Sequence, residues 1–196
     1  MKKGFIAVAA VMCTGLLAVT LHGQAPAQNA PAPTMSGGIK NAYNGVKNNL
    51  LKAAQAMPED GYAFTPTPAE RNFGGWVAHV ADAQTAGCSR VAGMPVQGTA
   101  ASKTTKADLI QALQDSFTTC DAVYNALTDA NATDTIAGGR GPGIRLALLA
   151  NNVAHDNECY GSMAVYLRLK GIVPPSSEGR GPGGPPMGGA PPAGRQ

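Results

Sequence analysis

Apolar residues recur at spacings of three and four in four stretches of the chain, a pattern typical of amphipathic helices. The first stretch covers residues 36–57, and Ser36 is its expected N-cap. The second opens with Thr67-Pro68-Ala69-Glu70, which has the order of a capping box with a first-turn proline, and it ends near Gly93-Met94-Pro95. Gly74-Gly75 weakens this second helix, so close approach of a neighbouring backbone or ligand is expected there.

The third and fourth helices follow a polar connection. Thr105 is expected to cap the third helix, with Asp108 at position N3. The fourth covers residues 143–171, is mostly apolar, and ends at Gly171 because Pro174-Pro175 cannot continue a helix. The chain contains no convincing strand pattern. We therefore predict an all-α fold, a four-helix bundle.

Both ends of the chain differ in composition from the predicted bundle. Residues 1–27 have the order of a secretory signal peptide: Lys2-Lys3, an apolar run, and a small-residue cleavage site. A membrane anchor is the alternative, although the apolar run is short. Residues 28–35 are expected to form a disordered linker, and residues 176–196, rich in Gly and Pro, a disordered tail. The bundle is thus assigned to residues 36–175.

Charge narrows the range of expected partners. Removing Lys2 and Lys3 from the 15 basic residues leaves 13 against 12 acidic ones, a formal charge of +1, and no basic cluster stands out. This balance argues against a nucleic-acid partner and leaves a small molecule as the expected substrate. The signal peptide predicts a secreted or periplasmic protein, with no stable membrane span after cleavage.

The cysteines favour one topology of the bundle. Cys88, Cys120 and Cys159 remain after export, an odd number for an oxidising compartment. Cys88 lies about twenty residues into the second helix and Cys120 about fifteen into the third, so their heights match only if these helices are parallel. The connection from Val96 to Thr104 is long enough to return along a helix. We therefore favour up-down-down-up topology with a Cys88–Cys120 disulfide; two buried free thiols are the alternative.

Two histidines and the third cysteine can meet in the core. His79 lies near the middle of the second helix, and His155 and Cys159 lie one turn apart on one face of the fourth. Two imidazoles and a thiolate match zinc sites with three protein ligands, which leave a fourth position for water or substrate. Satisfied core histidines and a space-filling cysteine are the alternative. Three polar residues could support these ligands or add a further one: Asp82, Asn152 and Glu158.

At these residues the chain resembles the DinB/YfiT-like superfamily. The resembling stretches are FTPTPAERNFGGWVAHVADAQ (Phe64 to Gln84) and NNVAHDNECYGSMAVYLRLKGIVPPSSE (Asn151 to Glu178). The resemblance implies an up-down-down-up four-helix bundle with a metal held by one histidine on the second helix and an H-x-x-x-H pair on the fourth. His79 and His155 match the first two ligand positions, whereas Cys159 replaces the third histidine.

The resemblance also implies a chemistry. Its members are similar to thiol-dependent transferases and isomerases, in which a metal presents a bound thiol as thiolate, and a hydrolase-like enzyme is a related expectation. Cys159 favours zinc or copper(I) over nickel or manganese, so zinc is the expected metal. The candidates for orienting an anionic substrate are Tyr160, Tyr166 and Arg168. The resemblance also allows a homodimer. The competing prediction is a non-catalytic structural or ligand-binding bundle with a degenerate metal site.

Overall fold

Four long helices dominate the computed structural model, which describes residues 32–96, 99–138 and 141–178. They belong to one compact unit that begins at Pro33. The all-α prediction is confirmed, with one addition: a short antiparallel strand pair, in which Thr135 lies opposite Ile144. In chain order the elements are α1 (Met35–Ala56), η1 (Glu59–Ala63), α2 (Phe73–Ala92), α3 (Lys106–Ala126), β1 (Thr135–Ile136), β2 (Gly143–Ile144), α4 (Arg145–Leu169) and η2 (Pro175–Ser177), where η denotes a 3-10 helix.

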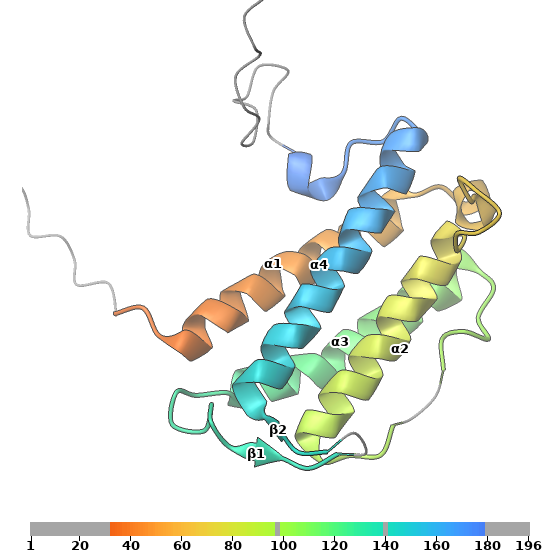
Figure 1. Cartoon of the computed structure of the whole chain (residues 1–196). Coiled ribbons are helices and arrows are strands. Elements are labelled where there is room, and N and C mark those ends of the chain that lie inside the picture. Colours follow the sequence, from red (N-terminus) through yellow and green to blue (C-terminus); the bar gives the residue numbers. More distant parts are fainter. Residues whose placement is uncertain (1–31, 97–98, 139–140, 179–196) are drawn as a thin grey trace, which may run out of the picture. The chain divides into compact units, whose positions relative to one another are not determined.

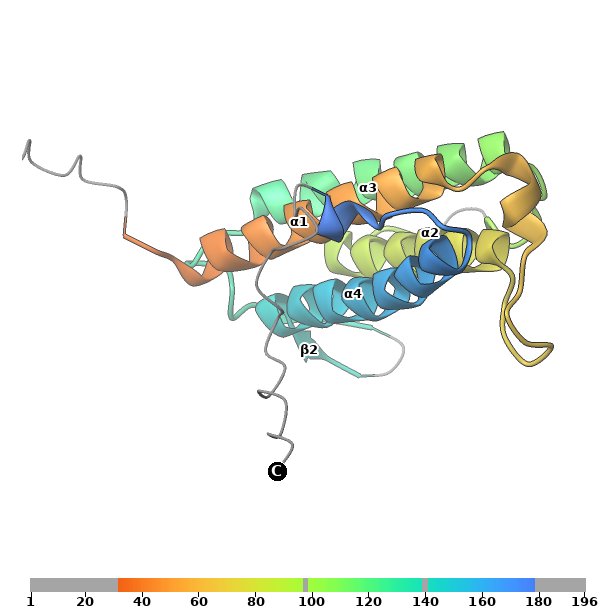
Figure 2. The same cartoon turned by 90° about the horizontal axis from the view of Figure 1, so that it is seen from above.

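The helices run up, down, down and up, as Figures 1 and 2 show. Contacts between helix ends fix these directions. At the start of α3, Lys106 Nζ donates to the Met57 carbonyl just after α1, at 2.7 Å. Near the end of α4, the Tyr166 hydroxyl donates to the Arg71 carbonyl just before α2. Helix α2 packs against α3 and α4, and α1 packs against the same two helices. The predicted topology is therefore confirmed.

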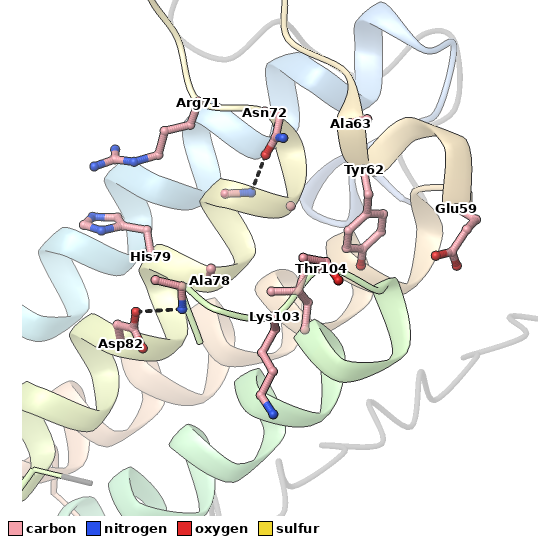
Figure 3. A pocket seen from close by; sticks show the side chains of 14 residues that line it. Glu59, Tyr62, Ala63, Arg71, Asn72, Ala78, His79, Asp82, Lys103 and Thr104 are labelled. Atoms are coloured by element: carbon pink, nitrogen blue, oxygen red, sulfur yellow. Dashed lines mark hydrogen bonds between the residues drawn. The ribbon is translucent and has the colours of Figure 1, made fainter. Parts of the chain in front are cut away.

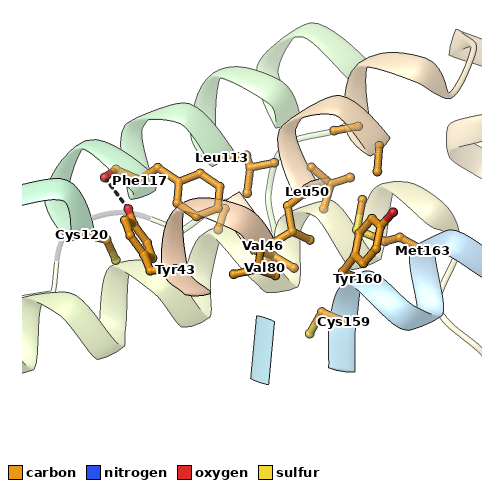
Figure 4. Close-up of a cluster of buried hydrophobic side chains, with 14 of the residues drawn as sticks. Tyr43, Val46, Leu50, Val80, Leu113, Phe117, Cys120, Cys159, Tyr160 and Met163 are labelled. Carbon is orange, nitrogen blue, oxygen red and sulfur yellow. Dashed lines mark hydrogen bonds between the residues drawn. The ribbon is translucent and has the colours of Figure 1, made fainter. Parts of the chain in front are cut away.

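The core lies between the inward faces of the four helices (Figure 4). Leu50, Leu113 and Met163 are fully buried, and each such side chain contributes roughly 1.5–3 kcal/mol when it leaves water. The rings of Tyr43 and Tyr124 stack with centroids 3.8 Å apart and join α1 to α3. Their positions follow the helical spacing seen in the sequence, so the apolar pattern alone identified this core.

Cys88 of α2 and Cys120 of α3 form a disulfide, with Cα atoms 5.1 Å apart. Both residues are fully buried. This is the pairing that the matched helix heights predicted, and it requires parallel α2 and α3. Cys159 is the free cysteine among the described residues, and it is buried.

Two of the predicted helix starts are wrong. Thr34, not Ser36, caps α1, and its hydroxyl accepts the Gly37 N–H at 2.9 Å. Ser36 lies inside the first turn, where its N–H donates to the Asp129 carboxylate at 2.8 Å. The linker expected at residues 28–35 is therefore ordered at its end, because it supplies the cap.

Helix α2 begins at Phe73, later than the capping box at residues 67–70 predicted. Asn72 is the N-cap, and its side-chain oxygen accepts the Gly75 N–H at 2.7 Å. The Phe73 N–H donates to the Phe64 carbonyl at 3.0 Å, which closes residues 65–72 into a loop. A helix starting at Pro68 could not make that bond. The hydrogen bond between Phe73 and Phe64 therefore outweighs the capping box at residues 67–70.

The start of α3 and the ends of α2 and α4 agree with the sequence, whereas α4 begins at Arg145 because Gly143 and Ile144 pair with β1. Thr105 caps α3 by accepting the Asp108 N–H at 3.1 Å. Gly93 and Gly171 end α2 and α4 with φ angles of 68° and 72°, a left-handed conformation that glycine adopts without strain. Gly74 is in the first turn of α2, and a Cβ there would lie 3.3 Å from the Tyr62 carbonyl oxygen. The close backbone approach expected at this glycine is present.

The described structure continues past Pro175, where the sequence placed the end of the bundle. Helix η2 follows, and Ser176 donates its N–H to the Tyr160 hydroxyl at 2.8 Å. The remainder of the expected tail, the signal peptide and residues 28–31 of the linker lie outside the described residues. Within the described ranges, a helix long and apolar enough to span a membrane is not found.

Candidate metal centre

The structure brings His79, His155 and Cys159 together between α2 and α4. The Nε2 atoms of His79 and His155 lie 3.1 Å apart. The Cys159 sulfur lies 3.7 Å from Nε2 of His155, one turn away on the same helix. One donor atom from each residue falls within 4.8 Å of the other two. The helical spacing therefore produces the convergence that the sequence predicted.

These distances fit a tetrahedral ion. With bonds of about 2.0–2.1 Å to nitrogen and about 2.3 Å to sulfur, two nitrogens lie about 3.3 Å apart and nitrogen and sulfur about 3.6 Å apart. The observed separations are 3.1 Å and 3.7 Å. Two imidazole nitrogens and one sulfur also form a donor set suited to zinc. Two of the three separations thus match a tetrahedral ion, and the three donor atoms as a set lie within 4.8 Å of one another, so the cluster has to contract for one ion to bind all three.

Asp156 supports His155 from inside the core. Its carboxylate is completely buried, and Oδ1 lies 3.9 Å from Nδ1 of His155. Oδ2 accepts a hydrogen bond of 2.7 Å from the Gln84 amide, whose carbonyl oxygen accepts the Asn152 amide at 2.6 Å. A carboxylate beside Nδ1 favours a proton on that nitrogen and leaves the Nε2 lone pair for a metal.

The sequence analysis missed Asp156, although a signal for it exists. Asp156 stands three positions after Val153 and seven before Met163, and both of these are buried. It is therefore an acidic residue on the apolar face of α4. Because burying an unpaired carboxylate is costly, that position indicates a structural or functional partner.

The pKa values of the three candidate ligands are shifted in different directions. The nearby Asp156 carboxylate raises the pKa of His155. Burial lowers the pKa of His79, and the charge of Arg71 lowers it further. Burial raises the pKa of the Cys159 thiol to about 12. Without a metal, His79 is thus neutral and Cys159 protonated at neutral pH, so metal binding has to displace the thiol proton.

The supporting residues named from the sequence have other partners. Asp82 accepts the backbone N–H groups of Ala100 and Ala101, and so fastens the α2–α3 connection. Asn152 joins Gln84 to the Tyr124 hydroxyl, which lies 2.8 Å from its side-chain oxygen. Glu158 is exposed on α4. Asp82 therefore holds a loop, and the support expected from it comes from Asp156.

The residues expected to orient an anionic substrate are likewise engaged elsewhere. The Tyr160 hydroxyl contacts the hydroxyl and N–H of Ser176, and Arg168 donates to the Ser177 hydroxyl at 3.3 Å. Both interactions hold η2 against α4. Tyr166 donates to the Arg71 carbonyl and accepts from the Trp76 indole at 3.2 Å. The segment after α4 thus folds back over Tyr160 and Arg168, and a role of the three residues in orienting a substrate stays a prediction.

A cavity of about 710 Å³ opens beside His79 (Figure 3). It lies between α2, η1, the start of α3 and the connection that Asp82 fastens. In Figure 3 the His79 imidazole and the Arg71 side chain both extend on the α4 side of α2. The side chain of His155 is 35% exposed, so solvent reaches the cluster. The polar or charged residues on the cavity wall include Glu59, Arg71, Asn72, His79, Asp82, Lys103 and Thr104.

Comparison with known proteins agrees with this architecture. A DinB-like protein from Bacillus cereus has a similar solved structure, with a TM-score of 0.61 and 18% identity over 70% of this chain and 94% of its own. A DinB-like protein from Bacillus subtilis gives a TM-score of 0.58 and 19% identity over 69% of this chain and 93% of its own. No functionally curated protein matches the chain. Residues 42–161 match the sequence profile of the DinB superfamily, and the chain therefore belongs to that superfamily.

Proposed function

We propose that this protein is an exported metal-dependent enzyme of the thiol-transferase type. The observation that carries the proposal is the convergence of His79, His155 and Cys159 at one solvent-accessible point. A closed structural site would need a fourth protein ligand, and none of the described residues adds one to this cluster. The fourth position is thus open to a small molecule.

Each residue of the site has its own proposed role. His79, His155 and Cys159 hold the metal, which we propose to be zinc, and Asp156 sets the proton position on His155. Metal coordination would lower the pKa of a bound thiol so that it is a nucleophile near neutral pH. In the overall reaction the thiol sulfur forms a C–S bond, the leaving group takes the electron pair of the bond that breaks, and the thiol proton passes to solvent. We propose that the second substrate enters from the cavity whose wall includes His79.

Export is part of the proposal. It rests on the expected signal peptide and is supported by the Cys88–Cys120 disulfide, because such bonds persist mainly in oxidising compartments. Net charge supports a small-molecule substrate over nucleic acid.

Metal content measured by mass spectrometry on untagged protein tests the proposal. We expect about one zinc per chain, lost in His79→Ala, His155→Ala and Cys159→Ser. Glu158→Gln is the matched control, because this exposed residue lies on the same helix. Metal-loaded protein should then conjugate 2-mercaptoethanol to a chromogenic aryl chloride. Absence of bound metal, or of metal-dependent turnover, would contradict the proposal.

A second candidate function is a non-catalytic bundle with a degenerate site. It is favoured by the 3.1 Å contact between His79 and His155, which can be a hydrogen bond without any metal. The scarcity of low-molecular-weight thiols outside the reducing cytoplasm supports it too. Cys159→His separates the two functions. Metal binding only in that variant would mark the natural site as degenerate.

A further inference from the structure

Arg71 is held beside the candidate metal centre from two directions. Its guanidinium lies over the Trp76 ring, 4.9 Å from the centroid. Its carbonyl accepts the Tyr166 hydroxyl, and the same hydroxyl oxygen accepts the Trp76 indole N–H at 3.2 Å. Main chain and side chain of Arg71 are thus both fixed by α2 and α4. An arginine held in this way loses little side-chain entropy when it binds a ligand.

The fixed guanidinium is directed to the side of α2 that carries the cluster. The Trp76 ring beneath it meets the His79 ring edge to face, with centroids 5.9 Å apart. Arg71 and His79 line the same cavity, and Figure 3 shows their side chains on one side of α2. Burial and then the positive charge of Arg71 lower the pKa of His79. A ligand at the cluster would therefore have this charge next to it.

Arg71 has no acidic partner within the described ranges. The ion pairs found there join Lys47 to Asp121, Lys52 to Glu178, Arg145 to Asp134, and His155 to Asp156. A guanidinium presents a planar fork of donors that matches a carboxylate, which it can bind through two parallel hydrogen bonds. An ordered, unpaired fork beside an open site is the arrangement that recognises a carboxylate-bearing ligand.

We propose that Arg71 binds the carboxylate of an anionic thiol whose sulfur occupies the open position at His79, His155 and Cys159. This inference rests on the proposed function and specifies its ligand class: small thiols that carry a carboxylate are preferred over neutral thiols. Arg71 is a specificity residue, because it touches the ligand away from the reacting sulfur.

Binding of two simple thiols to the cobalt-substituted full-length protein tests the proposal. Thioglycolate carries a carboxylate, 2-mercaptoethanol is neutral, and the thiolate-to-cobalt absorption reports binding of either. We expect thioglycolate to bind roughly tenfold more tightly at low salt. Arg71→Gln should abolish this preference, because it should weaken thioglycolate binding much more than 2-mercaptoethanol binding, and Arg71→Lys should keep part of it. Arg168→Gln is the matched control, because Arg168 contacts Ser177 and lies apart from the cluster.

The outcomes separate this inference from the proposed function. If wild-type protein binds both thiols equally, or if Arg71→Gln keeps the full preference, the role of Arg71 is refuted and the thiol site stands. If the protein binds no metal, or neither thiol, both proposals fail together. A preference that disappears in Arg71→Gln and persists in Arg168→Gln supports both.

Discussion

The Asp156 carboxylate lies 3.9 Å from Nδ1 of His155 through one oxygen and accepts the Gln84 amide through the other. It is completely buried, whereas the His155 side chain is 35% exposed. The histidine is thus held from the core side and free on the solvent side. The outward nitrogen of His155 lies 3.1 Å from Nε2 of His79, and the first prediction concerns a metal bound at this point.

Asp156→Asn should weaken zinc binding by about 10- to 100-fold, because the neutral amide no longer fixes the proton on Nδ1 of His155. Competition with a chromogenic chelator measures the affinity, and circular dichroism checks that the bundle is intact. Asp115→Asn, at an exposed position on α3, is the control and should leave the affinity unchanged. Equal zinc affinity in Asp156→Asn and wild type would show that Asp156 is only a core residue.

Zinc affinity should rise with pH. The pKa of Cys159 is raised to about 12, so between pH 7 and 9 the metal-free thiol holds a proton that zinc must displace. One proton released per ion predicts roughly tenfold tighter binding per pH unit. The pKa of His155 is raised, and below that pKa zinc must also displace a proton from His155, so zinc affinity then depends more steeply on pH. The lowered pKa of His79 keeps that residue neutral, so it adds nothing in this range.

The variant Cys159→His provides the comparison for this pH profile. Its three neutral imidazoles should bind zinc with little pH dependence above pH 7. Chelator competition at several pH values in both proteins makes the measurement. A flat profile in wild type would mean that the Cys159 sulfur is not a ligand.

The Cys88–Cys120 disulfide should contribute about 3–4 kcal/mol to the free energy of unfolding, given the length of chain that it closes. Its sequence separation is 32 residues. Urea unfolding of oxidised and reduced protein, both carrying Cys159→Ser to prevent exchange, measures the difference. Equal stability of the oxidised and reduced proteins would show that the disulfide contributes nothing to the free energy of unfolding.

Two glycines on helices should respond in opposite ways to alanine. A Cβ on Gly74 would lie 3.3 Å from the Tyr62 carbonyl oxygen and 3.2 Å from Leu109 Cδ1, whereas a Cβ on Gly45 meets nothing within 4 Å. Gly45→Ala should therefore stabilise the bundle by about 0.5–1 kcal/mol through helix propensity. Gly74→Ala should destabilise it, because the backbone of η1 cannot easily move. Thermal unfolding measures both, and stabilisation by Gly74→Ala would contradict the close approach.

The sequence predicted whatever depends on helical periodicity. The four helices, the parallel α2 and α3, the disulfide and the meeting of His79 with His155 and Cys159 all follow from spacing along helices. Details that depend on contacts between segments distant along the chain were not predicted. Thr67 has the sequence of a cap, yet Asn72 takes the role because Phe73 bonds back to Phe64.

The hydrogen bond between Phe73 and Phe64 also changes the environment of Arg71. A helix beginning at Pro68 would make Arg71 part of its first turns. In the structure Arg71 lies in the loop before α2 and stacks on Trp76, because the helix starts at Phe73. The pattern of α4 places Asp156 on the apolar face, but it cannot identify the partner Gln84, which lies on another helix.

The Asp82 carboxylate anchors the α2–α3 connection to α2 through the backbone of Ala100 and Ala101, and Asp82 and Ala101 also line the cavity. Lys103 and Thr104, further along the connection, line the cavity without contacting Asp82. Substitutions at Lys103 and Thr104 can then change which molecules enter without loosening the anchor. Evolution could thus retune the selectivity of this protein through a few loop positions and leave its helices untouched.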